Sequence, residues 1–443
     1  MPSRDDLKRR VYQEIDARAD QIVGLAKNIL ANPEPGFRET KTSRLVASEF
    51  AKIGITFRAG LPMTGVRSEL VGGSAGPTVA LLGELDSLIV NEHPFANPKT
   101  GAAHACGHHC QIAMIIGAAF GLMQPDILSA LSGRLVFMAV PAEEYIEIEY
   151  RDSLRRQGKI EFLGGKPELI KLGEFDDVDL AMMLHTTSNP DEKQICMSGT
   201  NNGTIAKRIQ FIGRGAHAGG APHLGINALN AATLALAAIH FNRETFRDED
   251  TIRVHPIITK GGEAVSAVPA DVRMETFVRG RTVEAIMDAN RKVDRALKAG
   301  ALAVGAKVTI QTLPGYLPLR QDKDLATVFE ANSVALVGRE NVGFGGHRTG
   351  STDMGDVSHL MPAIHPYVGG ATGLGHGANY LVEDYNLSVV IAAKALAGAV
   401  VDLLADGAAR AGDIIAGHRP EMSRDQYLAF MRKLASEETF DGV

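Results

Sequence analysis

The 443-residue sequence contains few cysteines, no basic block and no apolar segment at its N-terminus. Its only cysteines are Cys106, Cys110 and Cys196, and a sparse, odd set in a long chain excludes a disulfide framework and favours a reducing compartment. Residues 1–10 are mostly charged and lack the apolar core of a signal peptide. No uninterrupted apolar run is long enough to span a membrane. We therefore expect a cytoplasmic protein with no membrane partner.

Positive charge is also scarce. The formal net charge is -6 and the sequence pI is about 6.2, which argues against nucleic acid as a partner. The apolar fraction of 45% and the charged fraction of 22% are ordinary for a globular protein. A chain of this length is too long for a single core, so two domains are expected.

Residues 101–111 contain three histidines and two of the three cysteines. Cys106 and His108 are separated by one glycine, so a bend there could turn a thiolate and an imidazole toward the same point. The uncharged segment 112–123 that follows has the composition of a buried helix. Sulfur and nitrogen ligands at the start of such a helix suit a transition metal. The alternative is a small buried cysteine at a helix start, with histidines as polar caps.

Three apolar segments end in polar side chains that can do chemistry. Residues 77–86 read as a strand that is apolar on both faces, as in a parallel sheet, and they end in carboxylates. Residues 133–144 end in Glu143 and Glu144, and residues 180–186 end near His185. Open α/β sheets bind ligands at the carboxyl ends of their strands. These groups are therefore expected to converge at one edge of a parallel sheet.

The adjacent pair Glu143 and Glu144 needs a bend, because successive side chains of a strand point to opposite faces. If the strand kinks there, one carboxylate can bind metal while the other acts as a base; otherwise the pair is a solvated strand end. The glycine-rich segment 373–378 could bring His376 into the same crowded site. Together with Cys106, His108 and His185, these groups are sufficient for one or two metal ions.

From residue 204 the pattern changes to alternating strands and Ala-rich helices, in the order strand, helix, strand, strand, helix, strand. Apolar strands and helices like those of the first part resume after about residue 318. The second unit is therefore expected to be inserted into the first. We predict an α/β protein in which residues 1–203 and 316–443 form the first domain and residues 204–315 form the insert.

Seven segments, in order, resemble the motifs of one enzyme family: residues 83–86, 104–108, 141–144, 184–186, 213–219, 227–232 and 375–377. The resemblance is to metal-dependent amidohydrolases such as hippurate hydrolase, N-acyl-amino-acid amidohydrolases and indoleacetyl-amino-acid hydrolases. Residues 351–358 further resemble the subgroup of the aminobenzoyl-glutamate hydrolase B subunit. The resemblance implies a three-layer αβα catalytic domain with a parallel-rich sheet, and a two-layer α+β satellite domain that forms a homodimer.

The resemblance also assigns roles to individual residues. Five match the metal ligands: Cys106, His108, Glu144, His185 and His376. Glu143 matches the general base, and Asp86 matches a carboxylate that orients the metal site. His217 matches a satellite histidine that completes the partner subunit's site, and Arg279 and Asn227 match substrate-binding positions. The implied cofactor is zinc or manganese, with one or two ions per subunit.

The expected activity is hydrolysis of the amide bond of an N-acyl or N-aroyl amino acid. Three alternatives stay open: a dipeptidase or carboxypeptidase with the same site, a non-catalytic partner subunit, and a cysteine protease with Cys106 as nucleophile. The charged segment 145–157 either shapes the pocket or is a solvated helix, and we favour the solvated helix.

Overall fold

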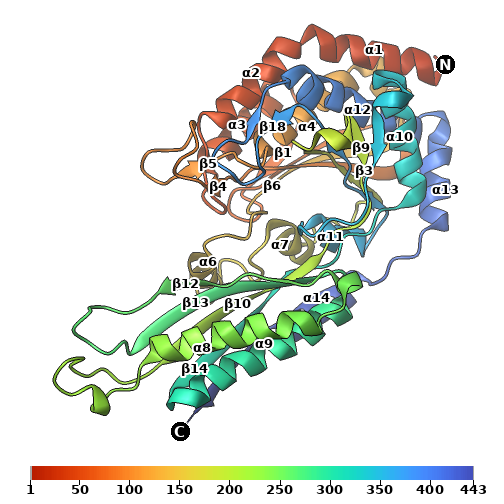
Figure 1. Ribbon diagram of the computed structural model, residues 1–443. Coiled ribbons are helices and arrows are strands. Elements are labelled where there is room, and N and C mark those ends of the chain that lie inside the picture. Colours follow the sequence, from red (N-terminus) through yellow and green to blue (C-terminus); the bar gives the residue numbers. More distant parts are fainter. Residues whose placement is uncertain (1, 443) are drawn as a thin grey trace.

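The computed structural model describes residues 2–442, which form two units, one above the other in Figure 1. The first unit contains a six-stranded sheet in which β6, β3, β7 and β16 are parallel and β2 runs antiparallel to β6. Its strands, in spatial order, are β1 (Phe57–Ala59), β2 (Val66–Val71), β6 (Ser132–Val140), β3 (Ser74–Glu84), β7 (Leu180–Met183) and β16 (Ala363–Ile364).

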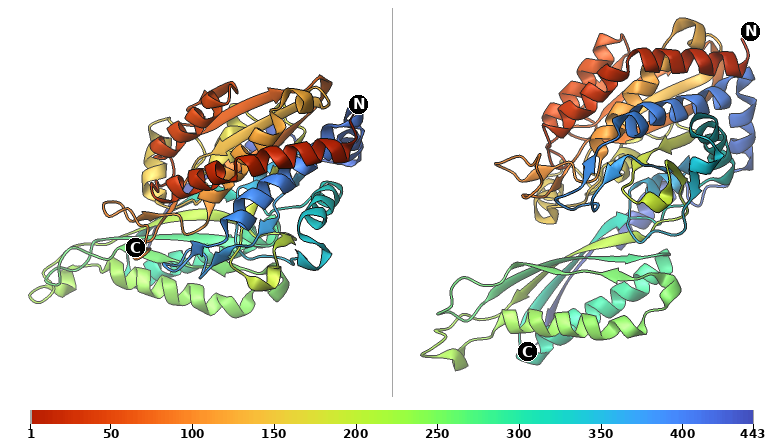
Figure 2. Two further views of the ribbon diagram at one scale, coloured as in Figure 1. Left: turned by 90° about the horizontal axis from the view of Figure 1, so that it is seen from above. Right: turned by 45° about the horizontal axis from the view of Figure 1, so that its top comes forward.

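Helices cover both faces of this sheet. Alternate strand residues such as Leu81 and Phe137 pack against one layer of helices, and Leu82 and Met138 pack against the other. The first layer comprises α1 (Arg4–Ala17), α2 (Ala19–Leu30), α4 (His108–Leu122) and α12 (Ala392–Leu404), and the second comprises α7 (Gly165–Leu172), α11 (Met354–Ser358) and α14 (Arg424–Leu434). The predicted three-layer αβα arrangement is therefore confirmed (Figure 2).

The helical segment Asn386–Leu404 joins a π-helical stretch (Asn386–Ile391) to α12 and has the length and apolarity of a membrane span, but 83% of its most apolar window is buried inside the protein. Two charged residues interrupt it: Lys394 pairs with Asp16, and Asp402 pairs with Lys8. This segment is a core helix of the first unit.

The remaining elements of the first unit lie around the sheet. A small four-stranded sheet has the order β15 (Val342–Phe344), β9 (Ile195–Met197), β17 (Tyr367–Val368) and β8 (His185–Thr186). Two short hairpins pair β4 (Leu88–Ile89) with β5 (Ala102–Ala103) and β18 (Ala371–Thr372) with β19 (Leu381–Val382). The other helices are α3 (Thr40–Lys52), α5 (Pro125–Leu128), α6 (Ile148–Arg156), α10 (Lys323–Val337) and α13 (Ala409–Gly417).

The second unit is an antiparallel sheet with two helices on one face (Figure 1). Its elements are β10 (Gly203–Ile212), α8 (Ala228–Phe241), β11 (Arg253–Val254), β12 (Ile257–Lys260), β13 (Asp271–Gly280), α9 (Val283–Val304), β14 (Lys307–Tyr316) and β20 (Ser436–Asp441). Inward residues of β13, among them Val272, Met274 and Val278, alternate with more exposed ones and pack under the helices. Three strands, β11, β12 and β13, lie between the two helices where the sequence predicts two, and β20 is a further addition to the predicted order.

One domain boundary differs from the prediction. The prediction that residues 316–443 lie wholly in the first domain is wrong at its end, because β20 pairs with β14 at the edge of the second sheet. The sequence pattern does not show this pairing, because β20 is mostly exposed and polar.

Candidate active site

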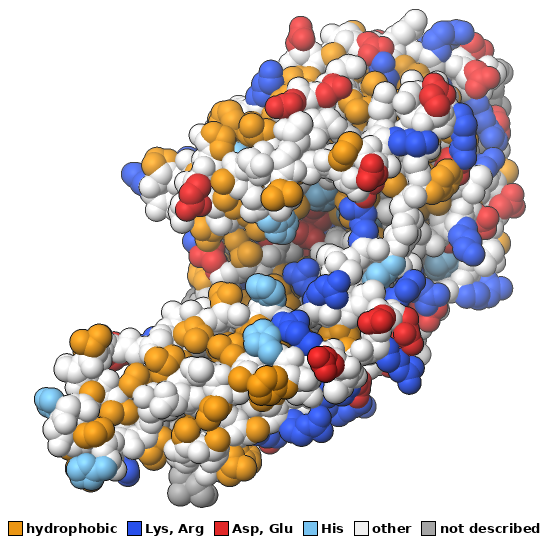
Figure 3. All heavy atoms as spheres, viewed as in Figure 1, with side chains coloured by type: hydrophobic (Ala, Val, Ile, Leu, Met, Phe, Trp, Pro, Cys, Tyr) orange, Lys and Arg blue, Asp and Glu red, His pale blue; other side chains and the backbone are white. Residues whose placement is uncertain are grey.

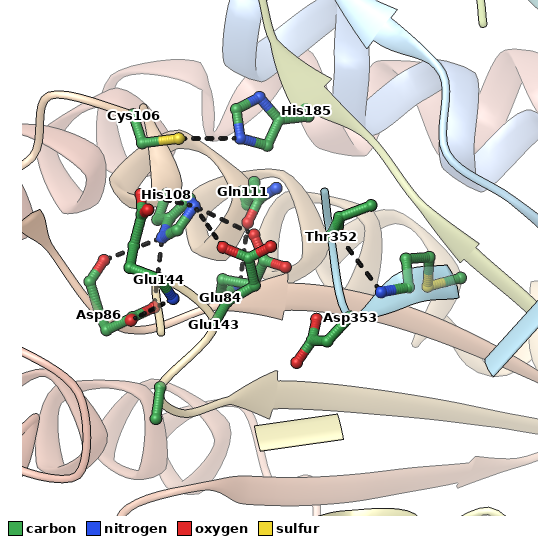
Figure 4. A network of polar contacts seen from close by, with 12 residues as sticks. Glu84, Asp86, Cys106, His108, Gln111, Glu143, Glu144, His185, Thr352 and Asp353 are labelled. Carbon is green, nitrogen blue, oxygen red and sulfur yellow. Dashed lines mark hydrogen bonds and ion pairs between the residues drawn. The ribbon is translucent and has the colours of Figure 1, made fainter. Parts of the chain in front are cut away.

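The chemically active side chains predicted from sequence converge where the parallel strands of the first unit end (Figure 4). Asp86 follows β3, Glu143 and Glu144 follow β6, and His185 lies on β8. Cys106 lies in the loop before α4, and His108 is the first residue of that helix. Gly107 between them has φ 95°, a left-handed conformation that glycine adopts at little cost.

A kink after β6 turns both glutamates toward the same imidazole. Ala142, which precedes them, has φ 58°, and Tyr145, which follows, has φ 39°. Glu143 Oε2 and Glu144 Oε1 consequently lie 4.0 and 3.8 Å from His108 Nε2. The pair is therefore part of the site and not a solvated strand end.

The predicted ligands form two groups that share Cys106. One group is Cys106, His108 and His185, and the other is Cys106, Glu144 and His376, with the ligand atoms of each within 4.8 Å of one another. Cys106 Sγ lies 3.3 Å from His185 Nε2, and His376 Nε2 lies 3.7 Å from Glu144 Oε2. The His376 side chain is 59% exposed, so the second group is open to the cavity.

The donor set fits divalent metal ions. Buried Glu144 Oε1 has no hydrogen-bond partner among the described residues, and His108 Nε2 faces carboxylate oxygens of Glu84, Glu143 and Glu144 at 3.1–4.0 Å. Although burial disfavours the imidazolium, the charge of Glu84 raises the pKa of His108 well above its usual value, so the surroundings favour positive charge there. Burial and the charge of His108 lower the pKa of His185 to about 4, which keeps this ring neutral and able to act as a ligand.

Asp86 holds the other side of His108. Its backbone oxygen lies 2.9 Å from His108 Nδ1, its Oδ1 lies 3.3 Å from the same nitrogen, and its Oδ2 accepts a 2.9 Å hydrogen bond from the Glu144 backbone N–H. A carboxylate that fixes the second nitrogen of a ligating histidine sets the orientation of the ring. Asp86 thus contacts both the ring of His108 and the backbone of Glu144.

Three buried charged residues beside the site are absent from the sequence prediction: Glu84, Lys166 and Asp353. Glu84 Oε2 lies 3.1 Å from His108 Nε2, and the Lys166 ammonium donates to Glu84 Oε1 (2.6 Å) and to Asp353. Burial opposes the charged form of Glu84, but Lys166 and His108 outweigh it and lower its pKa to about 2. The signal for Glu84 was its place at the end of an apolar strand, two residues before Asp86.

A cavity of about 300 Å³ opens onto these groups, lined by residues of both units. Figure 3 shows the hollow between the units, with acidic and histidine side chains inside it. Tyr145, Phe277 and Tyr316 form an aromatic wall, with ring centroids 5.3–5.8 Å from Tyr145. The cavity can therefore hold a small molecule with an apolar part next to the ligand groups.

The same cavity contains two guanidinium groups. Arg279, from β13, lies over the ring of Phe277, and burial lowers its pKa. Arg348, which is also absent from the sequence prediction, stacks on Tyr367 with 3.5 Å between its Cζ and the ring centroid and forms an ion pair with Glu192. Beside it, both ring nitrogens of buried His365 lack hydrogen-bond partners among residues 2–442. These groups give the cavity a donor-rich polar part.

Residues 80–400 match the sequence profile of peptidase family M20/M25/M40. The chain belongs to this family. It is a hydrolase that acts on amide bonds, and the resemblance seen in the sequence motifs is confirmed. Xaa-Arg dipeptidase of Mus musculus is 28% identical over 421 residues, covering 90% of this chain and 89% of the relative. IAA-amino acid hydrolase ILR1-like 4 of Arabidopsis thaliana is 26% identical, covering 79% and 77%.

Solved structures share the fold of this peptidase. The aminobenzoyl-glutamate utilization protein from Klebsiella pneumoniae superposes with a TM-score of 0.66 at 18% identity, covering 88% of this chain and 98% of the other. The YXEP protein of Bacillus subtilis, described as a dinuclear metal binding peptidase from the M20 family, has a TM-score of 0.63 at 20% identity and covers 88% and 99%. At these identities the likeness concerns the fold.

The structure places two predicted residues of the peptidase away from its own ligand groups. His217 lies on an exposed loop of the second unit and does not line the cavity of its own chain. Asn227 is the N-cap of α8, where its side-chain oxygen accepts hydrogen bonds from the backbone N–H groups of Leu229 and Asn230. The geometry therefore gives Asn227 a helix-capping role.

Proposed function

We propose that this hydrolase is a divalent-metal-dependent amidohydrolase that cleaves the amide bond of an N-acyl or N-aroyl amino acid. The observation that carries the proposal is the pair of three-residue ligand groups sharing Cys106, next to the buried carboxylate of Glu143. Five ligands and a base at the strand ends form a complete hydrolytic site, which argues against a non-catalytic partner subunit.

Cys106, His108 and His185 would hold one ion, and Cys106, Glu144 and His376 a second. Thiolate and imidazole ligands favour zinc, and manganese is the alternative that the carboxylate also accepts. When bound, a divalent ion supplies Lewis acidity that polarises the scissile carbonyl and makes water more acidic.

Glu143 is the proposed base. Its carboxylate takes a proton from the attacking water and later delivers it to the departing amine. Burial and the neighbouring charges of Glu84 and Glu144 raise the pKa of Glu143, and a raised pKa suits a group that exchanges protons near neutral pH. The adjacent backbone supports this role, because the Tyr316 hydroxyl donates a hydrogen bond to the Glu143 carbonyl and fixes the turn.

His217 is proposed to act in the site of a second copy of the chain. Its Nδ1 accepts hydrogen bonds from the backbone N–H groups of Gly219 (3.1 Å) and Gly220 (2.9 Å). In the neutral ring the proton is therefore on Nε2, which is left free to donate to the oxyanion of the tetrahedral intermediate. An exposed histidine held in one tautomer is better explained by a partner's site than by solvent.

The proposed homodimer forms through the second unit. Four large apolar side chains are exposed on its helix α8 and strand β12: Leu234, Phe241, Ile257 and Ile258. Figure 3 shows hydrophobic side chains spread over this unit. Unpaired apolar surface next to an edge strand is a typical basis for association.

The cavity indicates the substrate. The aromatic wall of Tyr145, Phe277 and Tyr316 suits an apolar or aromatic acyl group, and Arg279 suits the carboxylate of the amino acid. A dipeptidase is the second candidate, because the mouse relative that aligns over 90% of this chain is an Xaa-Arg dipeptidase.

The 3.3 Å contact between Cys106 and His185 also matches a cysteine-protease pair. Burial and Glu144 raise the pKa of the Cys106 thiol, which opposes the free thiolate nucleophile of a protease, whereas a metal ion would itself displace the thiol proton on binding. A thiol protease would also leave Glu143, Glu144 and His376 without a role.

The deciding experiment measures hydrolysis of N-acetyl and N-benzoyl amino acids and of dipeptides, before and after chelation and after re-addition of Zn²⁺ or Mn²⁺. We expect metal-dependent release of the amino acid from the N-acyl and N-aroyl compounds. Activity that survives complete metal removal would refute the metal-dependent function, and cleavage of dipeptides alone would assign the second candidate.

A further inference from the structure

Part of the charged segment after Glu144 is buried, contrary to the expectation of a solvated helix. It forms α6, which lies between the two units (Figure 1). Arg151 is 1% exposed and Asp152 is 0% exposed. Charged residues are almost never buried to this extent unless they are paired, so their partners indicate what the helix does.

Asp152 joins α6 to the second unit. Its carboxylate forms ion pairs with Arg208 of β10 at 2.6 Å and with Arg155 and Arg156 of its own helix, each at 2.8 Å. Glu149, one turn earlier, pairs with Arg208 and with Arg273 of β13. These contacts fix α6 on the second sheet.

Arg151 faces the opposite way, toward the ligand groups. Its Nη1 donates 2.8 Å hydrogen bonds to the carbonyl oxygens of Ala142 and Leu163. Its Nη2 lies 3.9 Å from Asp86 Oδ2 and has no hydrogen-bond partner among the described residues. The guanidinium thus contacts both the turn that carries Glu143 and the carboxylate that orients His108.

The turn that Arg151 holds is strained. Ala142, Tyr145 and Glu147 all have positive φ (58°, 39° and 52°) although none is glycine. Such conformations are unfavourable for residues other than glycine and persist only where the surroundings enforce them. Ala142 is held on both sides, since its N–H donates to Glu39 Oε1 (2.8 Å) and its carbonyl accepts from Arg151.

We propose that Arg151 is a positioning residue for the metal-binding and basic groups. It acts by two routes: through the Ala142 carbonyl it fixes the kink that turns Glu143 and Glu144 to the same point, and beside Asp86 it supplies the buried positive charge that keeps this carboxylate against His108 Nδ1. The inference rests on the proposed metal-dependent function. It goes beyond that function by placing part of the site's geometry on α6.

In the first part of the test, the metal-free protein is titrated with Co²⁺, and binding is measured by the visible absorption of the cobalt–thiolate site. In the second part, kcat and KM are measured at saturating metal. Orienting contacts behind a ligand typically change metal affinity or activity about 10–100-fold. Arg151→Met is therefore expected to weaken Co²⁺ binding and to lower kcat by about 10-fold or more in each case, with KM changed less than about 3-fold. Arg151→Lys keeps the charge but cannot make both carbonyl contacts. Its cobalt affinity and kcat are therefore expected to lie between those of the wild type and those of Arg151→Met.

Arg155→Met is the matched control. Arg155 is on the same helix and pairs with Asp152, but its side chain is 33% exposed and does not reach the site. Asp152 keeps its ion pairs with Arg208 and Arg156 when Arg155 is replaced, so the cobalt affinity and kcat are expected to stay near those of the wild type. In a double-mutant cycle on cobalt affinity, Arg151→Met and Asp86→Asn are expected to be less than additive, because both remove the contact between the guanidinium and the Asp86 carboxylate.

The inference is overturned if both Arg151 variants fold, bind Co²⁺ and turn over substrate like the wild type. It is also overturned if the loss of cobalt affinity in Arg151→Met simply adds to that in Asp86→Asn. If neither variant folds, Arg151 serves the stability of the core and the positioning role is wrong. A wild-type protein that binds no Co²⁺ would instead contradict the proposed function, which separates the two failures.

Discussion

The two adjacent glutamates give this peptidase an internal comparison between a base and a ligand. Glu143→Gln and Glu144→Gln are both nearly isosteric, lie on the same turn and remove one negative charge. Their surroundings differ, since Glu144 lies in a group with Cys106 and His376, whereas Glu143 lies in a group with Glu84 and His108. The two variants should therefore fail in different ways.

The backbone contacts of the turn predict that neither substitution disturbs it. The Tyr316 hydroxyl bonds the Glu143 carbonyl oxygen, and Asp86 accepts the Glu144 N–H, so the side-chain carboxylates do not carry these contacts. A general base contributes about 10²–10⁴-fold to the rate. At about 1.4 kcal/mol for each factor of ten, Glu143→Gln is expected to raise the activation barrier by about 3–5 kcal/mol.

The assay combines metal analysis after dialysis with steady-state kinetics. Glu143→Gln should keep the metal content of the wild type while kcat falls by about 10²–10⁴-fold. Glu144→Gln should lose metal from the group that contains His376 and keep the group of Cys106, His108 and His185. Turnover of Glu143→Gln within about tenfold of the wild type, or an equal loss of metal in both variants, would refute the assignment.

Three further outcomes are expected. His217→Ala should lose about 10²–10³-fold in kcat yet stay dimeric and metal-loaded. Mixing it with Glu143→Gln should restore some activity, and no recovery after verified subunit exchange would exclude action in the partner's site. Arg279→Met should raise KM for substrates with a free carboxylate and not for their amides; equal effects on both would remove Arg279 from carboxylate binding. Burial and the charge of Asp86 raise the pKa of Glu39 in the folded protein to about 7, above its value of about 4.3 in the unfolded chain. The contribution of Glu39 to the free energy of unfolding therefore falls as pH rises from about 4 to about 7. In the metal-free protein, the free energy of unfolding of Glu39→Gln minus that of the wild type should therefore increase from pH 5 to pH 8. A difference that stays constant across this range would contradict the raised pKa of Glu39.

Local patterns in the sequence were sufficient to predict much of the fold and several of the residues that meet at the site. The apolar strand over residues 77–86 reads as a buried parallel strand because both of its faces lack charge, and the structure buries both faces of β3 between two helix layers. Cys106 and His108 stand out because a single glycine, with φ 95°, lets both side chains turn to one point. These features depend on neighbours in the sequence, so the sequence alone determined them.

Other features depend on contacts between distant segments. Lys166 and Arg151 lie in stretches that look like solvated charged helices, yet both are buried, and the partners that stabilise them, Glu84, Asp353 and Asp86, are far away in the chain. The edge strand β20 joins a sheet whose other strands end at residue 316. Burial and pairing of charge are properties of the assembled chain, because only the packed structure determines which counter-charge replaces water. The sequence by itself therefore determined the strands, the kinked ligand loops and the family, whereas the tertiary structure decided which charged residues support the site from behind.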